Sequence, residues 1–343
     1  MAHGNGPASG TCDRSSAAGG DPLSDVLDHV ALEGALLFKV EASDPWCVDV
    51  PPAAEYAPLL APPRRRVISF HVVLSGAGTA ALPGGLRTGF RSGDVLVFAQ
   101  GDAYRMESAP EVPPEFDHPE MIAFFAALAA GRLPFIVEEG GGGAPRAEFV
   151  CGFLTAGQAV FDPLLAGLPR LLKVRRPAPG ADTLARLVEA AMAAFRTEGP
   201  GTGSIRRGLC RLMLAETLRQ HLGAAAGAGW LGALSDPVAS GALRAIHGDP
   251  GAPWTLAGLA REAGASRSVL AARFRDRTGQ APMDYLAAWR MQVAGEMMLR
   301  RGLSVEEAAE AVGYGSGQSF SRAFKRIAGQ PPGLWLRGAR APA

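Results

Sequence analysis

The chain has 343 residues, 48% of them hydrophobic, and a formal net charge of +1 at pH 7. The length exceeds that of one average domain and the apolar share is ample for hydrophobic cores, so two folded parts are expected. The longest apolar run, residues 121–130, is half the length of about 20 residues that a membrane helix needs, so no membrane segment is expected.

The cysteines and the N-terminal residues set the expected compartment. Cys12, Cys47, Cys151 and Cys210 lie far apart in the sequence and form no Cys-x-x-Cys pair, so neither a zinc site nor a disulfide framework is predicted. Residues 1–22 are rich in Gly, Ser and Ala and lack the apolar core of a signal peptide. We therefore expect a disordered tail over residues 1–22 and a cytoplasmic protein.

Short apolar segments separated by turn residues follow the tail, and this spacing predicts an antiparallel barrel or sandwich. The expected strands are residues 35–40, 46–50, 67–74, 79–82, 86–90 and 95–98. Residues 51–66 are expected to form a loop and residues 105–147 to be irregular, while residues 149–153 are expected to return as a strand that closes the barrel.

The order of glycines and polar residues in this region is similar to that of cupin-like sensor barrels. His71 is followed by Gly76, by Gly93-Asp94-Val95 and then by Gly101-Asp102. Metal-dependent cupins carry two closely spaced histidines, a glutamate and a later histidine, because these donors must converge on one ion. This chain has His71 alone, and Tyr104 occurs near the place of the later histidine. The resemblance therefore implies a barrel without a metal or another cofactor.

An organic effector is the expected ligand of such a barrel. Small-molecule sites are lined mainly by apolar side chains with a few polar groups that fix orientation. The candidate apolar residues are Phe70, Val72 and Phe98, and the candidate orienting residues are His71 and Tyr104. A second interpretation of His71 stays open, namely a strand histidine that only satisfies local hydrogen bonds.

Two amphipathic helices are expected next, over residues 181–195 and 204–221. Their apolar stripes suit either the core of the sensor or a dimer interface, and the sequence does not separate the two. Residues 23–222 would thus form a sensor and dimerisation domain, with its barrel over residues 23–175. The Gly- and Ala-rich residues 223–235 are expected to be an interdomain linker.

The C-terminal residues contain one helical pattern twice, about fifty residues apart. The apolar positions of the first helix recur at i, i+3, i+4 and i+7 in both copies, namely Leu256, Leu259, Ala260 and Ala263 against Val305, Ala308, Ala309 and Val312. Gly264 or Gly313 then makes a turn, and Ser266 or Ser316 follows as the cap of a second helix. The pattern predicts a tandem helix-turn-helix over residues 236–338.

Residues 313–326, with the sequence Gly-Tyr-Gly-Ser-Gly-Gln-Ser-Phe-Ser-Arg-Ala-Phe-Lys-Arg, are followed by Gly329-x-x-Pro332. This run resembles the signature of the AraC/XylS family of bacterial transcription regulators, and only Gln318 departs from it, where the family usually has Glu or Ala. The resemblance implies a monomeric DNA-binding unit that inserts two recognition helices into successive major-groove segments. Residues 236–343 carry 14 Arg and Lys against 9 Asp and Glu, the sign that phosphate neutralisation requires.

Residues that would face the DNA are those between the apolar positions of each recognition helix. The candidates are Arg267, Ser268, Ala271, Ala272 and Arg275 in the first copy, and Ser316, Gln318, Ser319, Arg322, Lys325 and Arg326 in the second. Arg can pair with guanine and Gln with adenine, whereas Ala contacts only a thymine methyl group. We assign Arg275, Lys325 and Arg326 to phosphates. The helix expected between the copies, residues 283–300, would be about 27 Å long, close to one turn of B-DNA.

The fold expected is therefore α+β in two domains, a β-rich cupin-like barrel with two following helices and an all-α tandem helix-turn-helix domain. The function expected is sequence-specific transcription regulation, with promoter DNA, RNA polymerase, a small-molecule effector and a second copy of the chain as partners. Two alternatives are an enzyme built on the barrel, for which the metal ligands are missing, and a DNA-repair alkyl acceptor, for which clustered cysteines are missing. No catalytic residue is expected.

Overall fold

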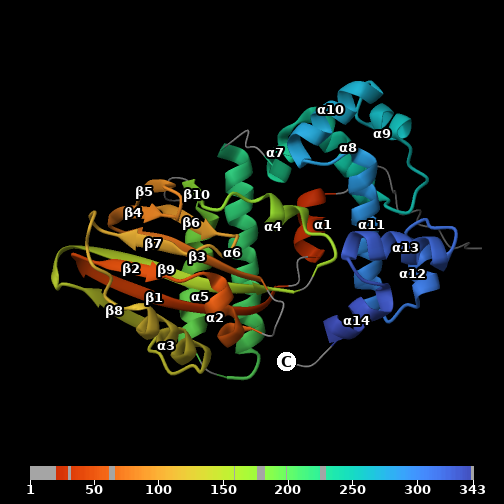
Figure 1. Cartoon of the computed structure of the whole chain (residues 1–343). Helices are drawn as coiled ribbons and strands as arrows, with labels where there is room; N and C mark the ends of the chain where they lie inside the picture. The colour runs from red at the N-terminus through yellow and green to blue at the C-terminus, as the bar shows by residue number, and fades with distance from the viewer. Residues whose placement is uncertain are drawn as a thin grey trace, which may run out of the picture.

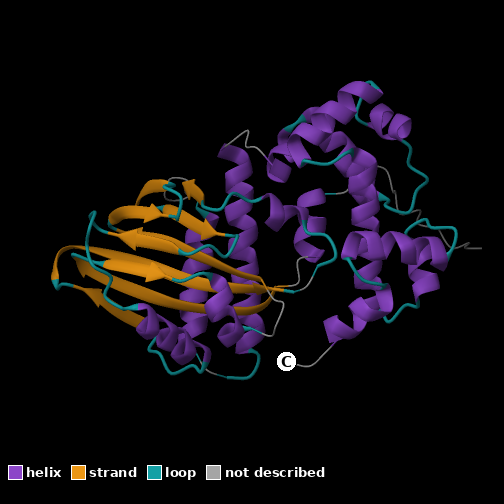
Figure 2. Cartoon of the chain, in the orientation of Figure 1, coloured by secondary structure: helices purple, strands orange, loops and turns teal. Residues whose placement is uncertain are grey.

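The computed structural model of the protein describes residues 21–29, 32–61, 66–157, 159–175, 182–197, 199–224 and 229–340. A β-rich N-terminal part and an all-helical C-terminal part lie next to each other (Figure 1, Figure 2). Most of the tail predicted over residues 1–22 lies outside the described residues, but its last residue, Pro22, already belongs to a helix. None of the described helices is both long and apolar enough to cross a membrane.

The strands form two sheets. Their bounds are β1 (Leu32–Asp44), β2 (Cys47–Val50), β3 (Arg66–Ser75), β4 (Ala77–Ala81), β5 (Arg87–Arg91), β6 (Asp94–Phe98), β7 (Tyr104–Glu107), β8 (Ile136–Gly140), β9 (Gly143–Ala156) and β10 (Leu172–Arg175). The six-stranded sheet has the order β10-β6-β3-β9-β1-β8, and the four-stranded sheet has the order β2-β7-β4-β5. Apolar side chains from both sheets share one core, which we call the barrel core; it includes Phe38, Val50, Ala80 and Phe149.

The helices occupy the remaining chain. Their bounds are α1 (Pro22–His29), α2 (Ala53–Leu60), α3 (His118–Ala129), α4 (Pro163–Gly167), α5 (Thr183–Arg196), α6 (Thr202–Ala224), α7 (Gly229–Ser235), α8 (Pro237–Gly248), α9 (Leu256–Glu262), α10 (Arg267–Thr278), α11 (Pro282–Arg300), α12 (Val305–Ala311), α13 (Gly317–Ala328) and α14 (Pro332–Arg340). Helices α5 and α6 pack on strand β1, and α6 also packs on β10. These two helices cover the six-stranded sheet on the side away from the barrel core.

Strand β3 shows how the two faces of the large sheet are used. Its residues are nearly all buried, because the barrel core lies on one side and helices lie on the other. Val67 and Val73 belong to the barrel core, whereas Ile68, Phe70 and Val72 belong to a second apolar cluster that continues into the helices. This is the alternation of period two that a pleated strand imposes.

All seven expected strands are confirmed, but two regions expected to be irregular contain regular elements. Helix α2 lies within residues 51–66, α3 and β8 lie within residues 105–147, and β7 extends into the latter region from Tyr104. Helix α3 begins with a capping box in which the Asp117 carboxylate accepts the Glu120 N–H and the Glu120 carboxylate accepts the Asp117 N–H, both at 2.9 Å. The prolines around residue 113 masked this start signal in the sequence.

Within the linker predicted over residues 223–235, residues 223–224 end helix α6 and residues 229–235 form helix α7. Trp230 and Leu231 of α7 are buried, and the Trp230 Nε1–H donates to the Tyr285 hydroxyl at 2.8 Å. The surrounding Gly and Ala residues suggested a flexible segment, but two large apolar side chains suffice to anchor a short helix. Residues 225–228 lie outside the described residues.

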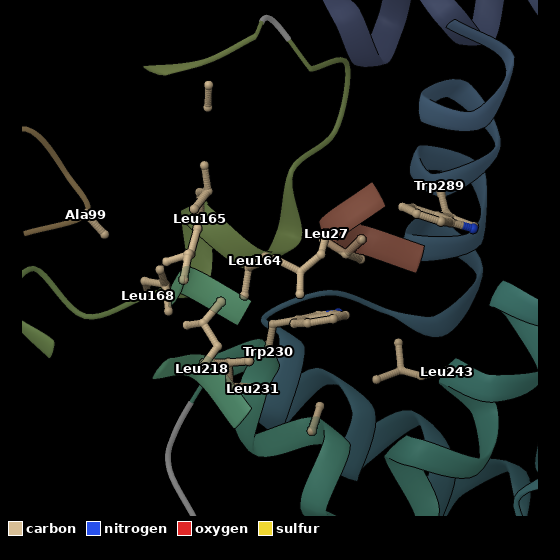
Figure 3. Packing of buried hydrophobic residues seen from close by; sticks show 14 of the residues in the cluster. Leu27, Ala99, Leu164, Leu165, Leu168, Leu218, Trp230, Leu231, Leu243 and Trp289 are labelled. Carbon is tan, nitrogen blue, oxygen red and sulfur yellow. The ribbon is translucent and has the colours of Figure 1, made fainter. Parts of the chain in front are cut away.

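The two parts of the molecule share a continuous apolar core. In Figure 3, Leu27 of α1, Leu164 of α4 and Trp230 of α7 lie between two groups of labelled side chains. Leu168 and Leu218 are on one side, and Leu243 and Trp289 of the C-terminal part are on the other. Because apolar burial is the main stabilising term in folding, this shared cluster fixes the C-terminal helices against the sensor part.

Polar contacts also cross the boundary between the two parts. The buried Gln292 side chain of α11 accepts the backbone N–H of Val160 at 2.7 Å and of Phe161 at 3.0 Å. The His29 imidazole of α1 lies 2.9 Å from the Glu296 carboxylate of α11. Helix α11 is therefore the main polar contact of the sensor part.

Candidate nucleic-acid interface and sensor cavity

The C-terminal part contains two helix-turn-helix units, α9 with α10 and α12 with α13. Each turn contains a glycine with positive φ, 61° at Gly264 and 78° at Gly313, a conformation that other residues rarely adopt. The Ser266 hydroxyl accepts the Val269 N–H at 3.3 Å, and the Ser316 hydroxyl accepts the Ser319 N–H at 3.2 Å. The predicted turns and helix caps are confirmed in both units.

Each recognition helix buries the two apolar residues that the sequence analysis assigned to its inner face. Leu270 and Phe274 of α10, and Phe320 and Phe324 of α13, have no exposed surface. Because these residues are four apart, they lie on one face of their helix and the opposite face is exposed. The helices thus present their outer faces while the aromatic residues hold them to the domain.

Most of the predicted DNA-facing residues lie on these outer faces. The exposed ones are Arg267, Ser268, Ala272, Arg275, Ser316, Gln318, Arg322, Lys325 and Arg326, while Ala271 and Ser319 are half-buried. The Ser319 hydroxyl donates to the Ser316 carbonyl at 2.8 Å, and the Ser316 hydroxyl donates to that of Ser319 at 3.1 Å. Both hydroxyls therefore stabilise the start of α13.

The cations on the outer faces differ from the other arginines of α10. Arg273 and Arg277 lie 3.6 and 3.7 Å from the Asp236 carboxylate, which also caps α8. Within the described part of the chain, no carboxylate forms an ion pair with the outer cations, which are Arg267, Arg275, Arg322, Lys325 and Arg326. Exposed cations without an acidic partner are the groups that phosphate binding requires.

Val269 is a residue of this surface that the sequence analysis missed. Its side chain is 45% exposed, although it is apolar and lies next to the buried Leu270. An exposed aliphatic side chain on a recognition helix can contact the methyl group of thymine. The sequence could have revealed its exposure, because α-helical spacing places residue 269 outside the stripe of buried residues that contains Leu270 and Phe274.

Helix α11 connects the two units, as predicted, and begins one residue earlier than expected. With 19 residues it is about 28 Å long. Arg290 of α11 donates from Nε to the Pro250 carbonyl and from an Nη to the Ala252 carbonyl, each at 2.7 Å, and its guanidinium lies over the Tyr314 ring. This side chain therefore links the loop before α9 to the turn before α13.

The barrel encloses a cavity with a free volume of about 50 Å³. It is lined by aromatic and aliphatic residues with few polar groups, namely Phe38, Val40, Trp46, Val48, Val50, His71, Tyr104, Met106, Met121, Phe124, Phe125, Glu139, Phe149, Cys151 and Phe153. We call this space the sensor cavity.

Two of the five predicted effector residues line the sensor cavity. The His71 Nε2 lies 2.9 Å from the Tyr104 hydroxyl, and the His71 Nδ1 lies 3.0 Å from the Cys151 Sγ. Burial lowers the pKa of His71 to about 3, so the imidazole is neutral. Phe98 stacks on the Tyr104 ring at 3.7 Å between centroids and does not itself line the cavity.

The prediction that Phe70 and Val72 line the cavity is wrong. Both side chains belong to the cluster on the helix-covered side of the large sheet. The physical reason is that residues 70 and 72 share one face of β3, whereas His71 is on the other face. A strand that is buried on both sides shows no polar alternation, so the sequence did not reveal which apolar residues face the cavity.

Glu139 is the acidic residue among the cavity-lining residues that the sequence analysis missed. It lies on β8, in the region expected to be irregular, and it is 7% exposed. Burial and then the charge of Glu115 raise the pKa of its carboxyl to about 7. Its neighbours Glu138 and Gly140 are exposed while Val137 is buried, and this alternation over Ile136–Gly140 is typical of a strand.

Among the residues that the structure describes, no group of three or more His, Cys, Asp or Glu side chains is arranged to hold a metal ion. Cys47, Cys151 and Cys210 are buried free thiols, and burial raises the pKa of each. Cys12 lies outside the described residues.

Comparison with known proteins agrees with this arrangement. Residues 21–223 match a cupin family model, and residues 259–338 match a helix-turn-helix domain model. An AraC-like transcription regulator of Streptomyces lividans is 31% identical over 94% of this chain and 100% of its own length. A second, from Streptomyces antibioticus, is 31% identical over 91% of this chain and 97% of its own length. Among solved structures, ToxT of Vibrio cholerae covers 90% of this chain and 98% of its own at 10% identity and a TM-score of 0.35. The chain therefore belongs to the AraC-like family of transcription regulators, in which it joins an N-terminal cupin domain to a C-terminal helix-turn-helix domain.

Proposed function

We propose that the protein reads two successive major-groove segments of promoter DNA with α10 and α13, under the control of an effector bound in the sensor cavity. The observation that carries this proposal is the pair of recognition helices with exposed, unpaired cations at the two ends of a helix about 28 Å long. The length is close to one turn of B-DNA, about 34–36 Å, so both helices meet the same face of the duplex.

The two recognition helices offer different chemistry to the bases. Helix α10 presents Arg267 with the apolar Val269 and Ala272, while α13 presents Gln318 and Arg322. Arginine pairs with guanine and glutamine with adenine through two hydrogen bonds each, whereas apolar groups contact only thymine methyl groups. Helix α13 therefore carries more of the base recognition, and Arg275, Lys325 and Arg326 bind phosphates.

A footprint of the full chain on an operator selected from random DNA tests this proposal. We expect two protected segments for each protomer, about ten base pairs apart on one face of the duplex, and an affinity that falls steeply with salt. One short protected segment would show that only one helix-turn-helix unit reads DNA.

In this proposal the protein is cytoplasmic, and its barrel acts as a sensor rather than as an enzyme. The barrel binds its effector without a metal ion. In support, His71 is held by Tyr104 and Cys151 on both ring nitrogens, so it has no free nitrogen for a metal. RNA polymerase is the further macromolecular partner expected of a regulator that acts at promoters.

Dimerisation through the N-terminal domain is proposed on the outer face of α6. The sequence left open whether the apolar residues of α5 and α6 form the core or a dimer interface. Leu184, Val188 and Met213 are buried in the core, but Ile205 and Leu212 are 56% and 54% exposed, and they lie seven residues apart on one face of α6. These two residues are the candidates for the interface, since exposed apolar side chains that share a face mark interaction sites.

Sedimentation equilibrium of a variant with Ile205→Asp and Leu212→Asp tests whether these two residues form the dimer interface. We expect the variant to be monomeric at concentrations where the parent chain is a dimer. Ile136→Asp is the matched control, because Ile136 is 41% exposed on the outside of β8, far from α6 in sequence. A dimer that persists in the α6 variant would place the interface elsewhere.

A further inference from the structure

Glu139 is a buried carboxyl in the sensor cavity that the packing of the barrel does not explain. Its side chain is 7% exposed, and its Oε2 has no hydrogen-bond partner among the described residues. A buried polar atom without a partner destabilises the native state, so most such atoms in proteins are paired. A carboxyl that a fold retains at this cost in a cavity is a candidate for ligand binding.

The surroundings of Glu139 leave its negative charge without compensation. No Lys, Arg or His of the described residues forms an ion pair with it, and the charged group that most affects it is another acid, Glu115. The Glu115 carboxylate itself accepts a hydrogen bond from the Gly140 N–H at the end of β8. The other ionisable groups that line the cavity, His71, Tyr104 and Cys151, are linked by hydrogen bonds through His71 and are uncharged.

The remaining walls are apolar and rich in aromatic rings. Trp46 and Phe149 line the cavity and meet edge to face with 5.3 Å between ring centroids, and Phe124 and Phe125 of α3 line it as well. Aromatic faces attract cations through their quadrupole, and a carboxylate in a desolvated site adds a strong charge-assisted partner. Aromatic rings combined with a single acid favour a positively charged group over a neutral or negative one.

We propose that the sensor cavity binds an organic cation, a protonated or quaternary amine whose positive group lies against Glu139 and whose apolar body contacts the aromatic walls. The inference rests on the proposed role of the barrel as the effector site and specifies the chemical class of the effector. A free volume of about 50 Å³ holds a small amine group, and the flexible Met106 and Met121 side chains in the wall yield to a larger apolar body.

Titration calorimetry of the full chain with two probes of equal size tests this proposal. Benzylamine is protonated at neutral pH, whereas benzyl alcohol is a neutral hydrogen-bond donor of the same shape. We expect benzylamine to bind the parent chain at least about tenfold more tightly than benzyl alcohol, because only the cation gains the carboxylate and the ring quadrupoles.

Two variants locate the effect. Glu139→Gln keeps the size of the side chain and removes its charge, and we expect it to weaken benzylamine binding at least about tenfold while benzyl alcohol binding stays within about twofold. Glu138→Gln removes a charge from the exposed side of the same strand and should leave both affinities unchanged. Unchanged near-ultraviolet circular dichroism, to which the aromatic side chains of the barrel contribute, shows that both variants fold.

The outcomes separate the two levels of inference. If benzyl alcohol binds as tightly as benzylamine, or if Glu139→Gln leaves benzylamine binding unchanged, the effector is not a cation, although the cavity remains a ligand site. If neither probe binds the parent chain, both the cation and the cavity as the effector site are refuted, and the reading of DNA by α10 and α13 stands by itself.

Discussion

Replacement of Glu139 by Gln should change how the stability of the barrel depends on pH. Burial raises the pKa of this carboxyl from 4.5 to about 7 in the native state, so the native state binds the proton more tightly than the unfolded chain does. The stability that this proton contributes is present below pH 4.5 and is lost as the pH rises towards about 7. At alkaline pH the ionised, buried carboxylate therefore lowers the free energy of unfolding of the parent chain, and the Gln variant has no such charge.

The magnitude follows from the two pKa values. A difference of one pH unit corresponds to about 1.4 kcal/mol, so the ionised carboxylate destabilises the native barrel by about 3 kcal/mol well above pH 7. Between about pH 5.5 and about pH 8 the parent chain should lose about 2 kcal/mol relative to the Glu139→Gln variant. Since Glu138 is exposed on the same strand, Glu138→Gln serves as the control that should show no such change.

Amide hydrogen exchange measured by mass spectrometry gives the free energy of opening for each segment separately. Peptides from β8 and β9 report the barrel, while peptides from α10 in the same sample give an internal reference that the substitution should not affect. Equal pH dependence of β9 in the parent chain and in the Glu139→Gln variant would refute the reasoning, because it would mean that the Glu139 carboxyl is solvated.

Two further predictions concern the DNA-binding part. Arg322→Ala should cost about 1–3 kcal/mol of operator binding and relax the preference at one base pair in a panel of single-base operator variants. Lys325→Ala should instead weaken binding to all sequences alike. If Arg322→Ala weakens all sequences alike and Arg267→Ala changes the preferred base, α10 rather than α13 carries the base recognition. A fragment of residues 229–343 should melt at a higher temperature than one of residues 236–343, because only the longer one has α7, which packs on α8 and α10 and donates from Trp230 to Tyr285. The difference should stay below the cost of about 3–5 kcal/mol for losing a fully buried Trp, since α4 and α6, which also cover α7, are absent from both fragments. Equal melting temperatures would show that α7 contributes nothing to this part.

The parts of the fold that were predicted from sequence are those whose signals are local. Gly264 and Ser266 specify a turn and a cap within three residues, and the same chemistry recurs at Gly313 and Ser316, so the helix-turn-helix units and the inner faces of their helices were correct. Repetition removed the ambiguity that a single short apolar helix would have left.

The errors arose where the answer depends on contacts between distant residues. Which side of β3 faces the cavity is decided by the packing of α5 and α6 about 115 residues later in the chain, so Phe70 and Val72 were placed on the wrong side. Glu139 became part of the site only because β8 pairs in parallel with β1, opposite Ala42. No local pattern predicts such a pairing, since parallel neighbours can be joined by long connections.

The hydrogen bonds of Gln292 have a mechanical meaning for a protein of this design. Val160 and Phe161, whose N–H groups donate to Gln292, lie four and five residues after the end of β9. This strand supplies Cys151 and Phe153 to the cavity wall. Gln292 itself belongs to α11, the helix that connects the two helix-turn-helix units and sets the distance between their recognition helices. We therefore expect a ligand that displaces β9 to act on the middle of α11 rather than on either recognition helix. The expected result is a changed spacing between the two DNA contacts, while each recognition helix keeps its own base preference.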